Sequence, residues 1–172
     1  GDKVWLEKKG LNNVIELDWW DQHNMKNAVI TFTPARHWSA RSLWDRNRSL
    51  WGSYLIQIEN KKIYFAGDTG YGKHFKEIFD RFNKIDVALL PIGAYEPREF
   101  MQEQHMNPFE AVQAHLDLAS QFSFGMHFGT FQLADEAQDA PIVELKKALD
   151  KFKLRDRDFK APLPLEAYCI PQ

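Results

Sequence analysis

Short hydrophobic runs dominate the first part of the chain and predict a meander of β-strands. In these runs apolar, aromatic and β-branched residues lie between polar or glycine-containing stretches. The strands are expected at residues 3–8, 14–20, 28–33, 52–58 and 62–66. Turns are expected at residues 10–13 and 21–24, and a short hairpin connection at residues 59–61.

The pattern then changes to helices that alternate with strands. In residues 74–82 the apolar positions recur at the spacing of one helical face. Asn107 is expected to cap a second helix, with Pro108 at its first position and Glu110 reaching back to the cap. The expected helices are residues 74–82, 107–120 and 141–152, and the expected strands are residues 85–92, 122–127 and 166–170. This order predicts an α+β fold, a mixed sheet with helices on one face.

Composition indicates one globular domain over residues 1–172, because 44% of the residues are hydrophobic, 27% are charged, and no linker or repeat divides the chain. The net charge of −2 and the scattered basic residues disfavour nucleic acid as a partner. No stretch reaches the ~20 apolar residues of a membrane span, and residues 1–5 lack the features of a signal peptide. We therefore expect a cytoplasmic protein or one peripheral to a membrane. The single cysteine, Cys169, is expected to be a buried small hydrophobe.

Three potential metal ligands each follow a predicted strand. Asp68 lies between Gly67 and Gly70 at the end of the run 62–66, where glycines let the backbone turn and approach a ligand closely. His37 follows the strand 28–33, and His127 ends the strand 122–127. Imidazole nitrogen and carboxylate oxygen are ligands of zinc, so we expect these side chains to meet at one edge of the sheet. Taken singly, each histidine also fits a hydrogen-bonded core residue, and the Asp68 segment also fits a simple turn.

Several ordered motifs resemble those of one family. They are His37-Trp38, Gly67-Asp68-Thr69-Gly70-Tyr71, the segment 91–98, Gln104-His105 with the segment 107–112, and His127-Phe128-Gly129-Thr130. Together they resemble the metallo-β-lactamase superfamily, and within it the N-acyl-phosphatidylethanolamine-hydrolysing phospholipase D group, over roughly residues 11 to 155. The resemblance implies half of an αββα sandwich, whose sheet has one face meant to be covered.

The superfamily signature His-x-His-x-Asp-His is absent from the 172 residues. The chain therefore resembles the C-terminal half of such an enzyme, and a missing N-terminal half is an implied partner. By the same resemblance, His37 would be a ligand of one zinc ion, His127 a ligand of the other, and Asp68 a bridge between the two. Two protein ligands per ion predict weak or absent zinc binding by this chain alone.

Gln104, His105, Arg98 and the tryptophans each fit either a functional or a structural role. Gln104 and His105 match a pair that borders the active site in the phospholipase group, so with Asp68 they are the expected catalytic residues; a capping or structural role is the alternative. Arg98 is expected to be structural, with Glu96 or Glu99 as its partner, and phosphate binding is the alternative. The tryptophans that bracket the loop after His37 are expected to pack the core or the missing half, with acyl chains or a membrane interface as the alternative.

The resemblance implies a zinc-dependent phosphodiesterase of the phospholipase D type that acts on a phospholipid-like or other phosphodiester and is inactive as this fragment. One alternative is a general metal-dependent hydrolase of the same fold that acts on another phosphoester or a lactone. The other is a non-catalytic binding or assembly module, in which the open sheet face binds a partner or a second copy of the chain. Peripheral contact with a membrane is compatible with each of these three functions.

Overall fold

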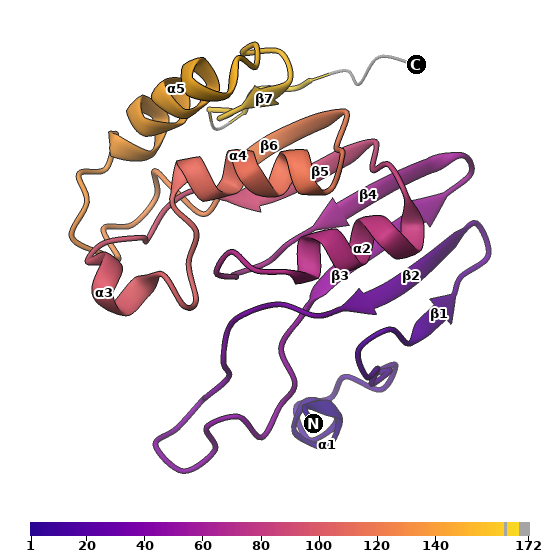
Figure 1. Ribbon diagram of the computed structural model, residues 1–172. Coiled ribbons are helices and arrows are strands. Elements are labelled where there is room, and N and C mark those ends of the chain that lie inside the picture. Colours follow the sequence, from indigo (N-terminus) through magenta and orange to yellow (C-terminus); the bar gives the residue numbers. More distant parts are fainter. Residues whose placement is uncertain (164, 169–172) are drawn as a thin grey trace.

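The computed structural model describes residues 1–163 and 165–168, and these form one mixed sheet with helices (Figure 1). Seven strands lie side by side in chain order. They are β1 (Gln22–Asn24), β2 (Ala28–Thr33), β3 (Ser53–Ile58), β4 (Lys61–Phe65), β5 (Val87–Pro91), β6 (Phe122–Met126) and β7 (Phe159–Lys160). The pairs from β1 to β4 are antiparallel, and the pairs from β4 to β7 are parallel. The predicted mixed sheet of an α+β fold is confirmed.

The helices that contribute to the core lie over one face of this sheet (Figure 1). The main ones are α2 (His74–Phe82), α4 (Pro108–Asp117) and α5 (Ala140–Phe152), and the short ones are α1 (Lys3–Glu7) and α3 (Arg98–Met101). α2 has the predicted bounds. α4 begins with the predicted capping box, in which Asn107 accepts from the Glu110 N–H at 2.9 Å while the Glu110 carboxylate accepts from the Asn107 N–H at 3.0 Å.

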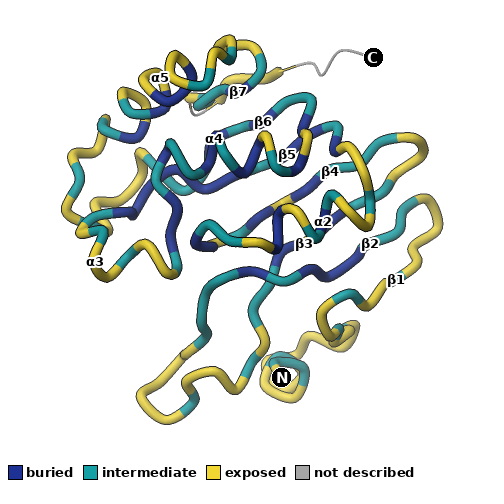
Figure 2. Tube along the Cα trace, viewed as in Figure 1, coloured by how far each residue is buried: buried dark blue, intermediate teal, exposed yellow. Residues whose placement is uncertain are grey.

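The helix-covered face of the sheet carries the core. Leu55, Tyr64, Ala88 and Ser123 are consecutive neighbours across β3, β4, β5 and β6, and each is at most 1% exposed. Figure 2 shows this burial as a dark band along the middle strands. Because side chains of a strand alternate between faces, these residues all point to the same side of the sheet, toward the helices.

The opposite face of the sheet is also apolar but is less covered. Its row runs Phe32, Tyr54, Phe65, Leu89 and Phe124 across β2 to β6. Tyr54 and Phe65 are each 41% exposed. This face of the sheet therefore exposes apolar surface. A strand with both faces apolar is typical of a sheet that is packed on both sides.

Four local expectations are wrong. Residues 3–7 of the expected strand 3–8 form α1, and residues 14–20 form no strand and end in a turn at residues 19–20. Trp20 has a φ of 75° and donates its N–H to the Phe32 carbonyl, so the chain turns there and pairing begins at Gln22, inside the expected turn. Residues 166–168 are not in a strand either, because β7 pairs with β6 in their place. Cys169 and residue 170 lie outside the described residues.

None of the helices in the described part of the chain combines the length and the apolar character required to cross a membrane.

His115 supplies a pH-dependent contribution to stability. It is 4% exposed on α4, its Nδ1 lies 2.8 Å from the Ser123 hydroxyl, and burial lowers its pKa from 6.5 to about 4. Between those two pKa values the unfolded chain binds the proton and the folded chain does not. Stability is therefore complete above pH 6.5 and falls as the pH decreases toward 4.

We expect His115→Gln to flatten this dependence. From pH 7 to pH 5 the His115 contribution amounts to about 2 kcal/mol, so the variant should lose that much less stability over the interval. Urea unfolding of both proteins at the two pH values measures the difference. Equal losses in the two proteins would contradict this role of His115.

Candidate metal centre

The predicted ligands lie at one edge of the sheet because the strands that precede them run in the same direction. β4, β5 and β6 are parallel, and β2 has the direction of β4 because both are antiparallel to β3. His37 follows β2, Asp68 follows β4, and His127 follows β6. The topology places all three residues at the same edge of the sheet, where Asp68 and His127 are in contact.

Asp68 and His127 form the closest pair. The Nε2 atom of His127 lies 3.4 Å from Oδ1 of Asp68, and the Nδ1 atom of His127 is buried without a hydrogen-bond partner within the described chain. A nitrogen and an oxygen that bind one tetrahedral zinc ion, each about 2.0–2.2 Å from it, are about 3.4 Å apart. The spacing of this pair therefore fits two ligands of one ion.

His37 has the hydrogen bonding of a histidine ligand. Its Nδ1 donates to the Trp38 carbonyl at 2.8 Å, a direction that follows because a carbonyl only accepts. Its Nε2 is buried, and nothing in the described part of the chain pairs with it. In metal centres a backbone carbonyl commonly holds one ring nitrogen in this way and leaves the other for the ion. The hydrogen bonding of His37 therefore fits that of a metal-binding histidine, with Nε2 as the binding atom.

His105 lies between the two predicted histidine ligands. Its ring centroid is 5.3 Å from that of His37 and 5.4 Å from that of His127, and its side chain is 8% exposed. Burial, with smaller contributions from His127 and His37, lowers the pKa of His105 to about 4. Gln104, the other expected catalytic residue, precedes it in the same loop, where its N–H donates to the Met101 carbonyl.

The described residues do not complete a metal centre by themselves. No three of their histidine, cysteine, aspartate or glutamate side chains converge closely enough to hold an ion. The residues that are present nevertheless fit part of such a centre, because His127 Nε2 lies 3.4 Å from Asp68, and one buried ring nitrogen in each of His37, His105 and His127 has no partner within the described chain. Leaving buried polar atoms unpaired costs free energy, which a bound ion would offset.

Close backbone contacts set the position of His127. Its φ is 61°, in the left-handed region, and a Cβ added at Gly93 would lie 2.2 Å from the His127 carbonyl oxygen. Only glycine allows the end of β5 to approach the end of β6 so closely. Strained backbone of this kind is often found at functional sites.

Arg36 connects three of the loops that form the site, and the sequence analysis did not single it out. Its N–H donates to the Thr69 hydroxyl and its carbonyl accepts from the Gly70 N–H, both at 2.9 Å. Its guanidinium donates to the Tyr71 carbonyl and to the Glu103 carboxylate. The only signal in the sequence is that Arg36 directly precedes His37.

Arg98 is structural, as expected, but its partner differs from the expected Glu96 or Glu99. Its guanidinium donates to both carboxylate oxygens of Glu110 at 2.8 Å and to the His105 carbonyl at 3.0 Å. Glu96 accepts from the Arg98 backbone N–H instead. The guanidinium therefore ties the loop that carries His105 to the first turn of α4.

Fold and site together define a class of protein, one with histidine and aspartate side chains at the ends of strands in an α+β sheet. A family model described as "Beta-lactamase superfamily domain" matches residues 3–128. The chain belongs to this superfamily.

Individual relatives are longer than the chain. An N-acyl-phosphatidylethanolamine-hydrolyzing phospholipase D 1 from Caenorhabditis elegans is 37% identical over 92% of the chain and 48% of the relative. A mitochondrial protein of the same activity name from Saccharomyces cerevisiae is 40% identical over 91% of the chain and 35% of the relative. The solved structure of Igni18, a metallo hydrolase from Ignicoccus hospitalis, matches with a TM-score of 0.69 at 22% identity, over 95% of the chain and 63% of that structure. The chain thus spans about half or less of the length of these two phospholipase D relatives.

We expect Arg36→Ala to loosen the loops that it joins. The variant loses two side-chain contacts on a guanidinium whose side chain is 41% exposed, worth about 1 kcal/mol of local stability, whereas its backbone bonds to Thr69 and Gly70 remain. Amide hydrogen exchange in residues 102–106 should become roughly fivefold faster. Arg155→Ala, which removes an exposed ion pair with Asp158, is the control. Unchanged exchange in Arg36→Ala would contradict the connecting role.

Proposed function

We propose that this chain supplies part of the two-metal centre of a zinc-dependent phosphodiesterase of the N-acyl-phosphatidylethanolamine phospholipase D type. One observation carries the proposal: the rings of His37, His105 and His127 are consecutive neighbours, each has a buried nitrogen without a partner in the described chain, and His127 Nε2 lies 3.4 Å from Asp68. The names of the relatives support the reaction, since two of them are phospholipases D.

In this proposal His37 Nε2 would hold one zinc ion, a ring nitrogen of His127 would hold the other, and the Asp68 carboxylate would be shared by them. When bound, such ions make water a usable nucleophile near neutral pH and offset the charge that develops on a phosphoryl group. Each ion would have two ligands from this chain, fewer than the usual three or four. We therefore propose that the chain alone binds zinc weakly and is inactive, and that ligands from outside it complete the centre.

His105 and Gln104 are proposed to act on the substrate. In phosphodiester hydrolysis water adds to phosphorus, the bond from phosphorus to the departing alcohol oxygen breaks, and that oxygen gains a proton. His105 Nδ1 has no partner in the described chain and lies between the two histidine ligands, so it is placed to exchange a proton with the departing alcohol. Gln104 would help to orient the phosphate.

Zinc titration followed by calorimetry tests the ligands on this chain. We expect Asp68→Asn to weaken zinc binding at least about tenfold, because it removes a charge and a ligand shared by both ions. His23→Gln is the matched control, since His23 lies on β1, away from the site edge. The proposal fails at this step if all three proteins have the same zinc affinity.

Activity is tested on a longer protein that contains this chain together with a His-x-His-x-Asp-His segment. With zinc bound, it should release phosphatidate from N-acyl-phosphatidylethanolamine, and His127→Ala should lower the rate by roughly 100-fold or more. Hydrolysis of only lactones or phosphomonoesters would favour the general hydrolase instead. Zinc binding without any hydrolysis would favour the non-catalytic module.

A further inference from the structure

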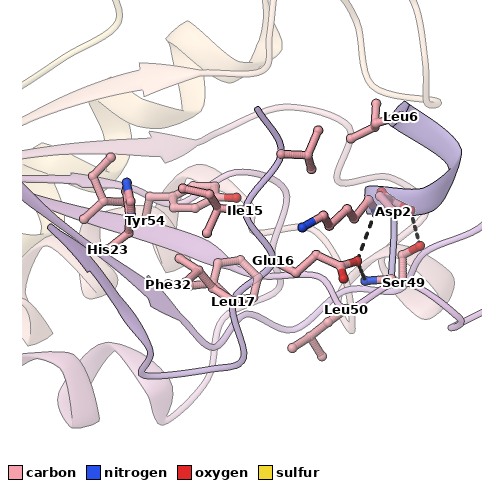
Figure 3. Close-up of a pocket in the computed structure, with 14 residues that line it drawn as sticks. Asp2, Leu6, Ile15, Glu16, Leu17, His23, Phe32, Ser49, Leu50 and Tyr54 are labelled. Carbon is pink, nitrogen blue, oxygen red and sulfur yellow. Dashed lines mark hydrogen bonds and ion pairs between the residues drawn. The ribbon is translucent and has the colours of Figure 1, made fainter. Parts of the chain in front are cut away.

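Two of the pockets in the described chain differ in the residues that line them. One pocket, of about 350 Å³, lies between residues 14–17 and strands β2 and β3, and Figure 3 shows Phe32 and Tyr54 beside it. Both residues belong to the less covered face of the sheet, so this pocket is part of an apolar surface. The other pocket, of about 20 Å³, is lined by His127 together with Glu136. A carboxylate that the sequence analysis did not single out thus shares a pocket with a proposed metal ligand.

The Glu136 carboxylate binds the loop that follows β5. Its Oε1 accepts from the Ala94 N–H at 2.6 Å, and its Oε2 accepts from the Glu96 N–H at 3.0 Å. Hydrogen bonds to an ionised acceptor are roughly twice as strong as those between neutral groups. Ala94 has a φ of 60°, which costs free energy in a residue with a Cβ, and the two bonds help to offset that cost. Glu136 therefore fastens its own loop to residues 93–97.

The loop that follows β6 folds back on itself and brings Glu136 close to His127. The Gln132 side-chain amide donates to the Glu136 carbonyl at 2.6 Å, and the Gln138 side-chain amide donates to the Gly129 carbonyl at 3.1 Å. The second of these bonds joins the two ends of the loop. His127 lies at the start of the loop and Glu136 near its end, so closure of the loop places them at the same pocket.

Residues 93–97 contact the His127 backbone directly. A Cβ added at Gly93 would lie 2.2 Å from the His127 carbonyl oxygen. The φ of 61° at His127 is a strained value, and such a value persists only where the surrounding structure holds it. The position of the His127 backbone therefore depends on the loop that Glu136 fastens.

The His127 ring has one nitrogen for a metal and a second for an orienting partner. Its Nε2 lies 3.4 Å from Asp68 Oδ1, whereas its Nδ1 is buried and has no partner within the described chain. In metal centres the second ring nitrogen of a histidine commonly donates to a carboxylate or a water. The pocket has room for a water, and each Glu136 oxygen can accept a second hydrogen bond beside the one from an amide. The pocket therefore has what a hydrogen-bonded chain from Nδ1 to Glu136 requires.

We propose that Glu136 is the residue that positions His127 for the metal. Its carboxylate holds residues 93–97 against the His127 backbone. Through one water in the pocket it also orients the ring, because Nδ1–H of His127 donates to the water and the water donates to the carboxylate. With the proton kept on Nδ1, the lone pair of Nε2 faces Asp68 and is available to an ion. The inference rests on the proposed role of His127 as a metal ligand, but the location of the proton is measured without zinc.

Nitrogen-15 NMR of the zinc-free chain, with its histidine rings neutral, shows which ring nitrogen of His127 carries the proton. The His127 signals are identified by their loss in His127→Gln. We expect the proton on Nδ1 in the wild type, and the ratio of the Nδ1-protonated to the Nε2-protonated form should fall roughly tenfold in Glu136→Ala. Glu136→Gln keeps an acceptor oxygen without the charge, so its ratio should fall roughly threefold. Asp135→Ala is the matched control, because it removes an exposed carboxylate one residue away and should leave the ratio unchanged.

Hydrogen exchange separates positioning of the ring from fastening of the loops. The Ala94 and Glu96 amides should exchange roughly tenfold faster in Glu136→Ala. If they do so while the His127 ratio stays at its wild-type value, Glu136 is only a structural link and the proposal is wrong. A proton on Nε2 in the wild type overturns it as well. Circular dichroism shows whether each variant folds; if Glu136→Ala is unfolded, an unchanged ratio in Glu136→Gln overturns the proposal.

Zinc titration of the same proteins connects the ring to the metal. We expect Glu136→Ala to bind zinc roughly tenfold more weakly than the wild type, and Asp135→Ala to bind it equally well. Equal, measurable affinities in all three proteins would show that Glu136 does not position His127 for a metal. If the wild type binds no zinc, the proposed metal centre on this chain fails, whereas the location of the His127 proton still decides the role of Glu136. The two failures are therefore distinguishable.

Discussion

Burial of Tyr64 under the helices is the constraint on which the rest of the structure depends. Tyr64 is completely buried near the end of β4, and its ring packs edge-on against Phe75 of α2, with the ring centres 6.2 Å apart. This position sets the register of β4 against Leu55 and Ala88, because a shift of one residue would turn Tyr64 to the other face of the sheet. Asp68 lies four residues beyond Tyr64, in the loop that follows β4, so the same packing determines where the carboxylate lies.

The edge of the sheet near Asp68 has features that lower the folding stability of the chain, and a role in a functional site would explain them. Buried ring nitrogens of three histidines lack partners within the described chain, and His127 has a φ of 61°. Each of these features costs free energy, and an ordinary strand end has no need of them. Arg36 is hydrogen-bonded to Thr69, and Arg98 is hydrogen-bonded to Glu110; these bonds hold the surrounding loops in place. In a preorganised metal centre, contacts of this kind orient the side chains that bind the ion.

The sheet face opposite the helices carries Tyr54 and Phe65 in a row of apolar neighbours, which suits another layer of structure. The two phospholipase D relatives extend well beyond the length matched by this chain.

The sequence by itself determined those features that depend on near neighbours. The spacing of apolar residues defined α2 at its observed bounds, Asn107 and Glu110 defined the start of α4, and the motif residues identified His37, Asp68 and His127. Only the tertiary structure decided that residues 3–7 form a helix, that pairing begins at Gln22, that Arg36 joins three loops, and that His105 stands between two other histidines. Helical periodicity and caps act within a few residues, whereas strand pairing and loop contacts depend on partners distant in the chain, whose choice is made by burial of the whole core.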